Sequence, residues 1–350
     1  MHKLAITSMS LGRATASHTL EAKLNAAHKY GYAGIELFHE DLLIHGLQNF
    51  PHLPPAAQQL AAARHILHLC QARNIAIVCL QPFAHYEGLL DRTAHAAHLE
   101  KLKLWIQLAH ELETDMIQIP ASFLPAPQVS DDLDLIVSDL QIVADMGAAA
   151  DPPIRFAYEA LCWSTVVDVW EDAWEVVKRV DRPNFGTCLD TFNIAGRIYA
   201  DPAVAGCTAD GADEAVRASM ARLVASVDVS KVFYVQVVDA ERLREPLVEG
   251  HAFYDAEQPA RMSWSRNCRL FYGETGRGAY LPVKEISRAF FHGLGFEGWV
   301  SLELFNRRMN DAGNDVPDEL ARRGAVSWEK LARDMRFVDA VPSGRISASL

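Results

Sequence analysis

Four side chains with oxygen donors recur at one position in four β-like segments. Glu159, Asp190, Gln236 and Glu303 lie near the ends of the mostly apolar runs 154–161, 184–193, 232–240 and 298–305. A carboxylate inside an apolar segment is costly unless it is paired or bound to a metal. One such group alone is usually a strand-end residue that faces solvent or a loop. Four of them at the same position of four strands indicate one divalent-metal site.

The donor set limits which metal could bind. Three carboxylates and one amide oxygen are hard ligands, which suit Mg²⁺, Mn²⁺ or Co²⁺. A structural zinc site would favour thiolate and imidazole ligands instead. We therefore expect Mn²⁺ or Mg²⁺, with Co²⁺ as a further option, and we expect Glu159 and Glu303 to serve in catalysis as well as in metal binding.

The elements that would position these donors alternate along the chain. Eight β-like runs are expected, at 4–12, 34–38, 75–83, 116–123, 154–161, 184–193, 232–240 and 298–305. Helical patterns are expected at 20–30, 55–73, 94–112, 133–144, 166–180, 212–226, 282–294 and 317–336. Strands that are apolar on both faces and separated by helices form a parallel sheet. Eight such units in 350 residues predict a (β/α)₈ TIM barrel.

A doubly wound open sheet is the alternative fold. It is disfavoured because no GxGxxG or GxxxxGK[ST] turn follows the first strand. We expect residues 1–340 to form a single catalytic barrel domain and 341–350 to form a flexible tail. Active sites of such barrels lie at the carboxyl ends of the strands, where the four donors fall.

Two long connections, 41–53 and 241–279, are predicted as loops because neither has a strong helical pattern. The second contains Arg261, Arg266, Arg269 and Arg277 among aromatic residues and is interpreted as a lid. Arginine is well shaped to bind a carboxylate, so we expect this lid to hold an anionic substrate. Arg266 and Arg269, with Ser265, are the preferred candidates. The alternative is a solvated basic stretch on an acidic surface.

Two of the 14 histidines follow strand ends, and these are candidates for a general base. His39 comes after the second strand and His85 after the third, so either could reach the cleft. The pairs His65/His68 and His95/His98 lie on expected helices and are interpreted as surface groups.

Net charge, cysteine spacing and hydropathy exclude several classes of protein. The net charge of −12 argues against non-specific nucleic-acid or membrane-surface binding. The six cysteines include no CxxC pair, and reduced thiols are expected. The chain shows no apolar stretch that could span a membrane and no signal-peptide pattern at its start, so a cytoplasmic protein is expected. The oligomeric state is left open.

The strand motifs resemble the xylose-isomerase-like barrels of the sugar-phosphate isomerase/epimerase superfamily. Those barrels carry Glu, Asp, His or Gln, and Glu on strands 5 to 8, which correspond to Glu159, Asp190, Gln236 and Glu303. More narrowly, YEALCW, LDTFNIAGR, SWSRNCRLFYGE and SLELFNR resemble the 3-dehydroshikimate dehydratases of fungal quinate catabolism. The resemblance covers nearly the whole chain.

This resemblance implies a lyase with a small anionic substrate. The reaction would be a metal-dependent dehydration of 3-dehydroshikimate to protocatechuate. A ketose/aldose isomerase or epimerase on the same metal site is the alternative. A non-catalytic barrel used for binding is disfavoured, because buried polar ligands would then be kept at a cost in stability.

Two departures from relatives concern the general base. Some bacterial relatives carry a histidine where this chain has Leu161 or Asn193. Asn193 is therefore expected among the substrate-binding residues. The base would be His85, ranked slightly before His39, with Glu36 or a hydroxide on the metal as further options.

Overall fold

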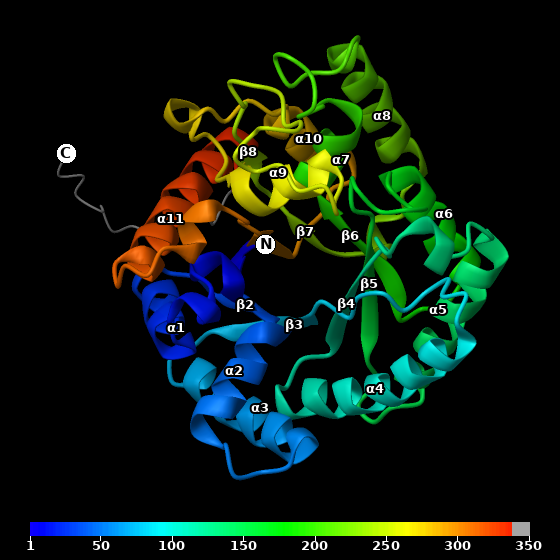
Figure 1. Ribbon diagram of the computed structural model, residues 1–350, viewed down its shortest axis with the longest axis vertical. Coiled ribbons are helices and arrows are strands. Elements are labelled where there is room, and N and C mark those ends of the chain that lie inside the picture. Colours follow the sequence, from blue (N-terminus) through cyan, green and yellow to red (C-terminus); the bar gives the residue numbers. More distant parts are fainter. Residues whose placement is uncertain (338–350) are drawn as a thin grey trace.

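A closed barrel of eight parallel strands forms the centre of the computed structural model, which describes residues 1–337 (Figure 1). The strands are β1 (Lys3–Thr7), β2 (Gly34–Phe38), β3 (Ala76–Gln81), β4 (Met116–Pro120), β5 (Arg155–Glu159), β6 (Phe185–Asp190), β7 (Val232–Gln236) and β10 (Trp299–Leu302). Neighbouring strands pair in parallel, and β10 closes the ring against β1. The predicted TIM barrel and the eight predicted strands are confirmed.

Helices surround the barrel; most form an outer ring, whereas α9 lies inward, at the mouth of the barrel (Figure 1). They are α1 (Leu20–Lys29), α2 (His39–Asn49), α3 (Pro55–Gln71), α4 (Arg92–Glu111), α5 (Leu133–Ala148), α6 (Trp170–Val180), α7 (Thr191–Ile198), α8 (Ala212–Ser226), α9 (Ala260–Cys268), α10 (Val283–Arg288) and α11 (Val316–Met335). Their apolar stripes face the strands. In α6, for example, Trp170, Trp174 and Val177 follow helical spacing and are buried. The helix predicted at 282–294 is α10 followed by a π-helical turn at Ala289–Gly293.

Both segments predicted as long loops contain helices, so that prediction was wrong in part. Residues 41–53 fall mostly within α2, where Leu42 and Gly46 lie buried one turn apart. Segment 241–279 contains α9 and β9 (Arg269–Leu270), and β9 pairs antiparallel with β8 (Asp239–Ala240), directly before the segment. The polar composition of α9 concealed a helix that tertiary packing stabilises through buried Trp264 and Cys268.

Apolar side chains fill the amino-terminal half of the barrel interior, and polar ones fill the other end. The inner apolar cluster comprises Ala5, Val78, Cys79, Met116, Ala157, Cys188 and Tyr234. All six cysteines are buried and free of disulfides, as predicted. The described helices include none long and apolar enough to cross a membrane. The boundary predicted at residue 340 and the predicted tail 341–350 lie outside the described residues.

Candidate active site and metal centre

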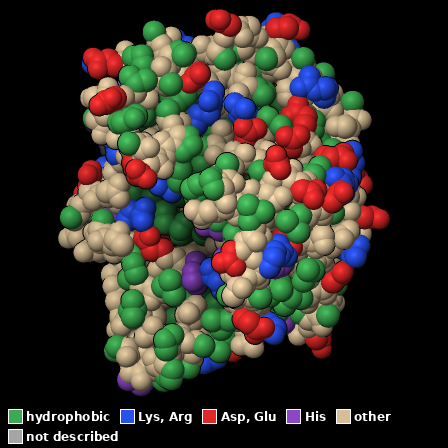
Figure 2. Space-filling view, turned by 45° about the vertical axis from the view of Figure 1, so that its right-hand side comes forward, with side chains coloured by type: hydrophobic (Ala, Val, Ile, Leu, Met, Phe, Trp, Pro, Cys, Tyr) green, Lys and Arg blue, Asp and Glu red, His purple; other side chains and the backbone are tan. Residues whose placement is uncertain are grey.

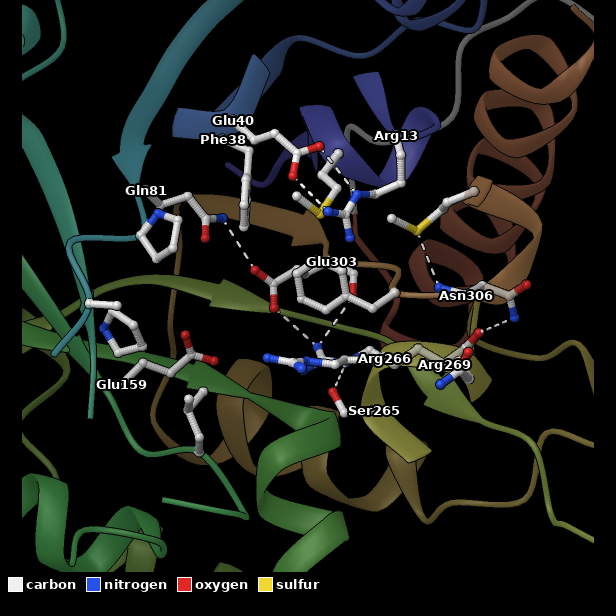
Figure 3. Close-up of a pocket in the computed structure, with 18 of the residues that line it drawn as sticks. Arg13, Phe38, Glu40, Gln81, Glu159, Ser265, Arg266, Arg269, Glu303 and Asn306 are labelled. Atoms are coloured by element: carbon white, nitrogen blue, oxygen red, sulfur yellow. Dashed lines mark hydrogen bonds and ion pairs between the residues drawn. The ribbon is translucent and has the colours of Figure 1, made fainter. Parts of the chain in front are cut away.

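A cavity of about 470 Å³ opens at the carboxyl ends of the strands. Figure 2 shows this face hollowed, with apolar side chains inside and charged ones around the rim. The wall residues come from the loops after most of the strands, and they combine carboxylates, amides, arginines and aromatic rings. Those that matter most below are Gln118 and the residues labelled in Figure 3 as Arg13, Glu40, Gln81, Glu159, Ser265, Arg266, Arg269 and Glu303.

Three of the four predicted metal donors meet at the floor of this site. Glu159 ends β5, Asp190 ends β6 and Glu303 directly follows β10. Each offers a carboxylate oxygen, and these oxygens lie within 4.8 Å of one another. All three side chains are buried, and burial raises the pKa of each carboxyl group. Loss of their hydration makes full ionisation costly unless a cation compensates the charge.

Gln236, the fourth predicted donor, is fully buried on β7 beside Asp190, its partner in the strand register. Its Nε2 atom donates to both oxygens of Glu36, at 3.3 and 3.0 Å. That bond fixes the amide orientation and leaves Oε1 without a hydrogen-bond partner among residues 1–337. A buried amide oxygen without a partner is costly, and a metal ion would satisfy it.

The donor set therefore fits a divalent cation. The cluster consists of oxygen atoms only, which suits Mg²⁺ or Mn²⁺. One positive charge is already present, because Arg269 lies among the carboxylates. With the three acids ionised, a divalent cation would bring the net charge of the group to zero.

Amide side chains hold the carboxylates in place, and the sequence reasoning missed two of them. Gln118 donates to Glu159, and Gln81 donates to Glu303 at 3.2 Å. Asn193 donates to Glu159 at 2.8 Å and to Asp190 at 2.7 Å. Gln81 and Gln118 are polar residues near the ends of the apolar strands β3 and β4, the same signal that identified the four donors.

Asn193 has a different position from the one expected. Both of its polar atoms are engaged within the protein, since Oδ1 also accepts from the amide of Cys162 at 3.1 Å. It lies behind Glu159 and Asp190 and is absent from the residues that line the cavity. These contacts place Asn193 between the two carboxylates and the amide of Cys162.

Arg269 is buried against the carboxylates rather than extended toward solvent. Its Nη1 atom donates to Asp190 at 3.0 Å and to Glu303 at 3.1 Å, and its Nε atom donates to Ser265 at 3.1 Å. The guanidinium also stacks 4.2 Å from the ring centre of Phe192. Only Nη2, which has no partner among the described residues, is left for a substrate.

The other three candidate arginines, Arg261, Arg266 and Arg277, have separate positions. Arg266 is exposed and lines the cavity, with Nη1 donating to Gln258 at 2.9 Å. Arg261 donates to backbone carbonyls of α7 and the following turn, and Arg277 forms ion pairs with Glu274 and Glu319 away from the cavity. Of the two arginines of this segment that line the cavity, Arg266 is thus the one with more freedom to bind a ligand.

Neither histidine predicted to reach the cleft lines the cavity. The ring of His39 faces Trp105 of α4 and bonds to Gln59 of α3. His85 packs edge-on against Phe123, which does line the cavity, and its Nδ1 atom has no partner among residues 1–337. Burial lowers the pKa of both imidazoles to about 4, so both are neutral at pH 7.

One further pair at the cavity mouth was missed by the sequence reasoning. Arg13, in the loop after β1, binds Glu40 of α2 through two hydrogen bonds of 3.2 and 2.6 Å. Arg13 and Glu40 lie in no recognised motif, and 27 positions separate them in the chain, so no sequence signal paired them.

Residues 24–331 match the family model described as a xylose isomerase-like TIM barrel. The 3-dehydroshikimate dehydratase of Neurospora crassa is 66% identical over 356 residues, which cover 99% of this chain and 99% of that protein. The 3-dehydroshikimate dehydratase of Pseudomonas aeruginosa is 28% identical over 85% of this chain but only 38% of its own length. Among solved structures, the IolI protein with a bound zinc atom superposes with a TM-score of 0.68 at 16% identity, covering 95% of this chain and 98% of that chain.

Proposed function

This chain belongs to the xylose isomerase-like TIM barrel family, and we propose that it dehydrates 3-dehydroshikimate to protocatechuate. One observation carries the proposal: the full-length identity of 66% to the Neurospora crassa dehydratase. The site supports it independently, because a buried carboxylate cluster and an arginine at the cavity mouth suit a substrate with oxygens at one end and a carboxylate at the other.

The reaction removes a proton from C6 of the ring and releases the C5 hydroxyl as water. Enolisation of the C3 ketone toward C4 then completes the aromatic ring. Glu159, Asp190, Gln236 and Glu303 would hold a divalent cation, Mn²⁺ or Mg²⁺ with Co²⁺ as a further option. When bound, such a cation supplies Lewis-acid stabilisation of the negative charge that develops on the ketone oxygen.

The protein's own groups orient the ring between the floor and the mouth of the cavity. Glu159 and Glu303, which line the floor, would receive the end of the substrate that carries the C3 and C4 oxygens. Arg266 would bind the carboxylate on C1, and Ser265, whose hydroxyl accepts from Arg269, would contribute its proton as a donor. Aromatic walls, including Phe305, exclude water around the ring and strengthen these polar contacts.

The base that takes the C6 proton is proposed to be His85, with His39 as the second candidate. Ala84 lines the cavity directly before His85, and the unpaired, neutral imidazole could accept a proton. Because Phe123 lies between His85 and the cavity, this role requires Phe123 to turn aside when substrate binds. His39 is less well placed, since it faces α3 and α4.

A direct assay tests the proposed function. The purified protein with Mn²⁺ or Mg²⁺ is incubated with 3-dehydroshikimate, and the ultraviolet band of protocatechuate is followed. Appearance of the band supports the dehydratase. Conversion of a ketose or its epimer in place of 3-dehydroshikimate would favour the isomerase alternative, and no turnover of either would favour a binding protein.

We also propose that the enzyme acts in quinate and shikimate catabolism in the cytoplasm. The support is the fungal relative and the absence of a membrane-crossing helix among the described residues. Loss of growth on quinate after deletion of the gene, together with a cytosolic signal from a tagged copy, is the expected result. Growth equal to that of the parent strain would contradict the pathway assignment.

A further inference from the structure

The Arg13–Glu40 pair on the cavity wall is not used by the mechanism above. Arg13 donates Nε to Oε1 of Glu40 at 3.2 Å and Nη2 to Oε2 at 2.6 Å, and both residues line the cavity. In Figure 3 they lie across Glu303 from Ser265 and Arg269. This bidentate contact fixes the plane of the guanidinium. The Nη1 atom has no hydrogen-bond partner among the described residues and remains available.

Arg266, the other arginine on the rim, has no carboxylate within ion-pair distance in the described part of the chain. Its protein partner is the amide oxygen of Gln258, a neutral group. Partial loss of hydration lowers the pKa of Arg266 and the positive charge of Arg13 lowers it further, while Asp255 acts in the opposite direction, so the two guanidinium groups repel each other. Glu40 offsets the charge of Arg13, so the charge of Arg266 is the one left without a bound carboxylate, and an anionic ligand between the two arginines would relieve their repulsion.

Arg269, the third arginine of the cavity, is not free to bind an anionic ligand at the mouth. Arg269 is fully buried, and two of its three nitrogens are committed to Asp190, Glu303 and Ser265. The arginines of the cavity therefore lie in two places. Arg269 serves the carboxylates of the floor, while Arg13 and Arg266 are left at the mouth.

We propose that Arg13 is a second substrate-binding arginine, which grips the substrate carboxylate together with Arg266 from the facing wall. Glu40 acts as a positioning residue that holds Arg13 in orientation. The inference rests on the proposed function, since protocatechuate and 3-dehydroshikimate both carry a carboxylate at the ring end remote from the oxygens. It explains why two arginines from distant segments share one cavity mouth.

Equilibrium binding of two related rings tests this assignment on protein loaded with Mn²⁺. Protocatechuate carries the carboxylate, and catechol is the same ring without it. In the double variant Arg13→Met/Glu40→Gln, which leaves no unpaired acid, protocatechuate should bind roughly 10-fold to 100-fold more weakly. The dissociation constant of catechol should stay within about twofold of wild type, since that ring makes no arginine contact.

The matched control is Arg155→Met/Asp115→Asn. That pair is also bidentate, at 2.8 and 2.9 Å, and its arginine is similarly exposed, but it lies at the start of β5 on the opposite end of the barrel. The control should leave both dissociation constants unchanged.

Three results would overturn the assignment of Arg13. An unchanged protocatechuate constant in the double variant, while wild type converts 3-dehydroshikimate, rejects Arg13 and leaves the proposed function intact. If protocatechuate and catechol lose affinity equally, the Arg13–Glu40 pair only maintains the structure of the cavity mouth. A wild-type protein that neither converts 3-dehydroshikimate nor prefers protocatechuate to catechol overturns the proposed function, and this inference with it.

Discussion

The Nη1 atom of Arg269 lies 3.1 Å from Oε2 of Glu303, and both side chains are buried. A residue that the sequence marked as a substrate clamp is therefore part of the carboxylate cluster. The same nitrogen reaches Asp190, so one arginine offsets part of the negative charge of the proposed metal site. The sequence named Arg266 and Arg269 as equal candidates for binding the substrate carboxylate. The contact with Glu303 gives Arg269 a different role from that of Arg266.

Replacing these two arginines should give opposite results. Arg269→Met leaves Asp190 and Glu303 buried without their cation, which should cost about 3–5 kcal/mol of stability and lower Tm. Arg266→Met should leave Tm unchanged and raise KM, because it removes a charge-assisted contact worth about 2–5 kcal/mol. Thermal unfolding and steady-state kinetics measure the two effects. Arg277→Met, away from the cavity, is the control, and a similar Tm for both variants would contradict this division of roles.

Metal binding should depend on the carboxylates at the strand ends. Asp190→Asn and Glu303→Gln remove charge with little change of shape, so the barrel should remain folded while activity is lost. Equilibrium dialysis of wild type should give one Mn²⁺ per chain, and a chelator should abolish turnover reversibly. Retention of one metal per chain after replacement of Glu159, Asp190, Gln236 and Glu303 by alanine would refute the site.

Asn193→Asp tests the amide that joins two of the acids. The new carboxylate would face Glu159 and Asp190 at hydrogen-bond distance, where a neutral donor now lies. Like-charge repulsion in a buried site should lower Tm by several degrees in the presence of a chelator, and added Mn²⁺ should restore most of the loss. Thermal unfolding with and without Mn²⁺ measures this. Asn267→Asp is the control. Equal Tm values for wild type and Asn193→Asp in chelator would argue against the proposed hydrogen bonds from Asn193 to Glu159 and Asp190.

The pH profile of kcat identifies the base. Since burial lowers the pKa of His85 to about 4, a base at this position loses activity only below about pH 4. His85→Asn should reduce kcat by roughly 10²–10⁴ and abolish that acidic limb. His39→Asn is the matched comparison, because the pKa of His39 is also lowered to about 4. Wild-type rates and profiles in both variants would exclude both histidines.

Ionisation of the buried Glu87 should lower the free energy of unfolding as pH rises. It is buried, with Oε1 accepting from the amide of Ser122 at 2.7 Å and Oε2 unpaired in the described residues. Burial raises its pKa to about 7, so the folded state retains a proton that the unfolded chain has already lost. Stability therefore falls as pH increases from about 4.5 to 7.

The variant Glu87→Gln removes this dependence. At pH 8 it should be more stable than wild type by roughly 3 kcal/mol, and at pH 4 the difference should vanish. Urea unfolding at the two pH values measures it, with the exposed Glu249→Gln as control. An equal advantage at both pH values would show that packing rather than ionisation is responsible.

The sequence by itself determined the barrel and the floor of the site. Strand and helix periods depend on residues close in the chain, so the eight strands could be recognised one by one. Parallel strands of a barrel bring their carboxyl ends to one rim, and this rule alone predicted that Glu159, Asp190 and Glu303 would meet.

Only the tertiary structure decided the directions of side chains outside the strands. The polar pattern of residues 260–270 did not show that Arg269, the first residue of β9, turns inward while Arg266 of α9 stays at the mouth. Arg13 and Glu40 are 27 positions apart in the chain and carry no motif, yet they form one wall of the cavity. His39 and His85 follow strand ends, but packing against Trp105 and Phe123 turns their rings away. Such directions depend on contacts between distant segments, which local sequence patterns do not encode.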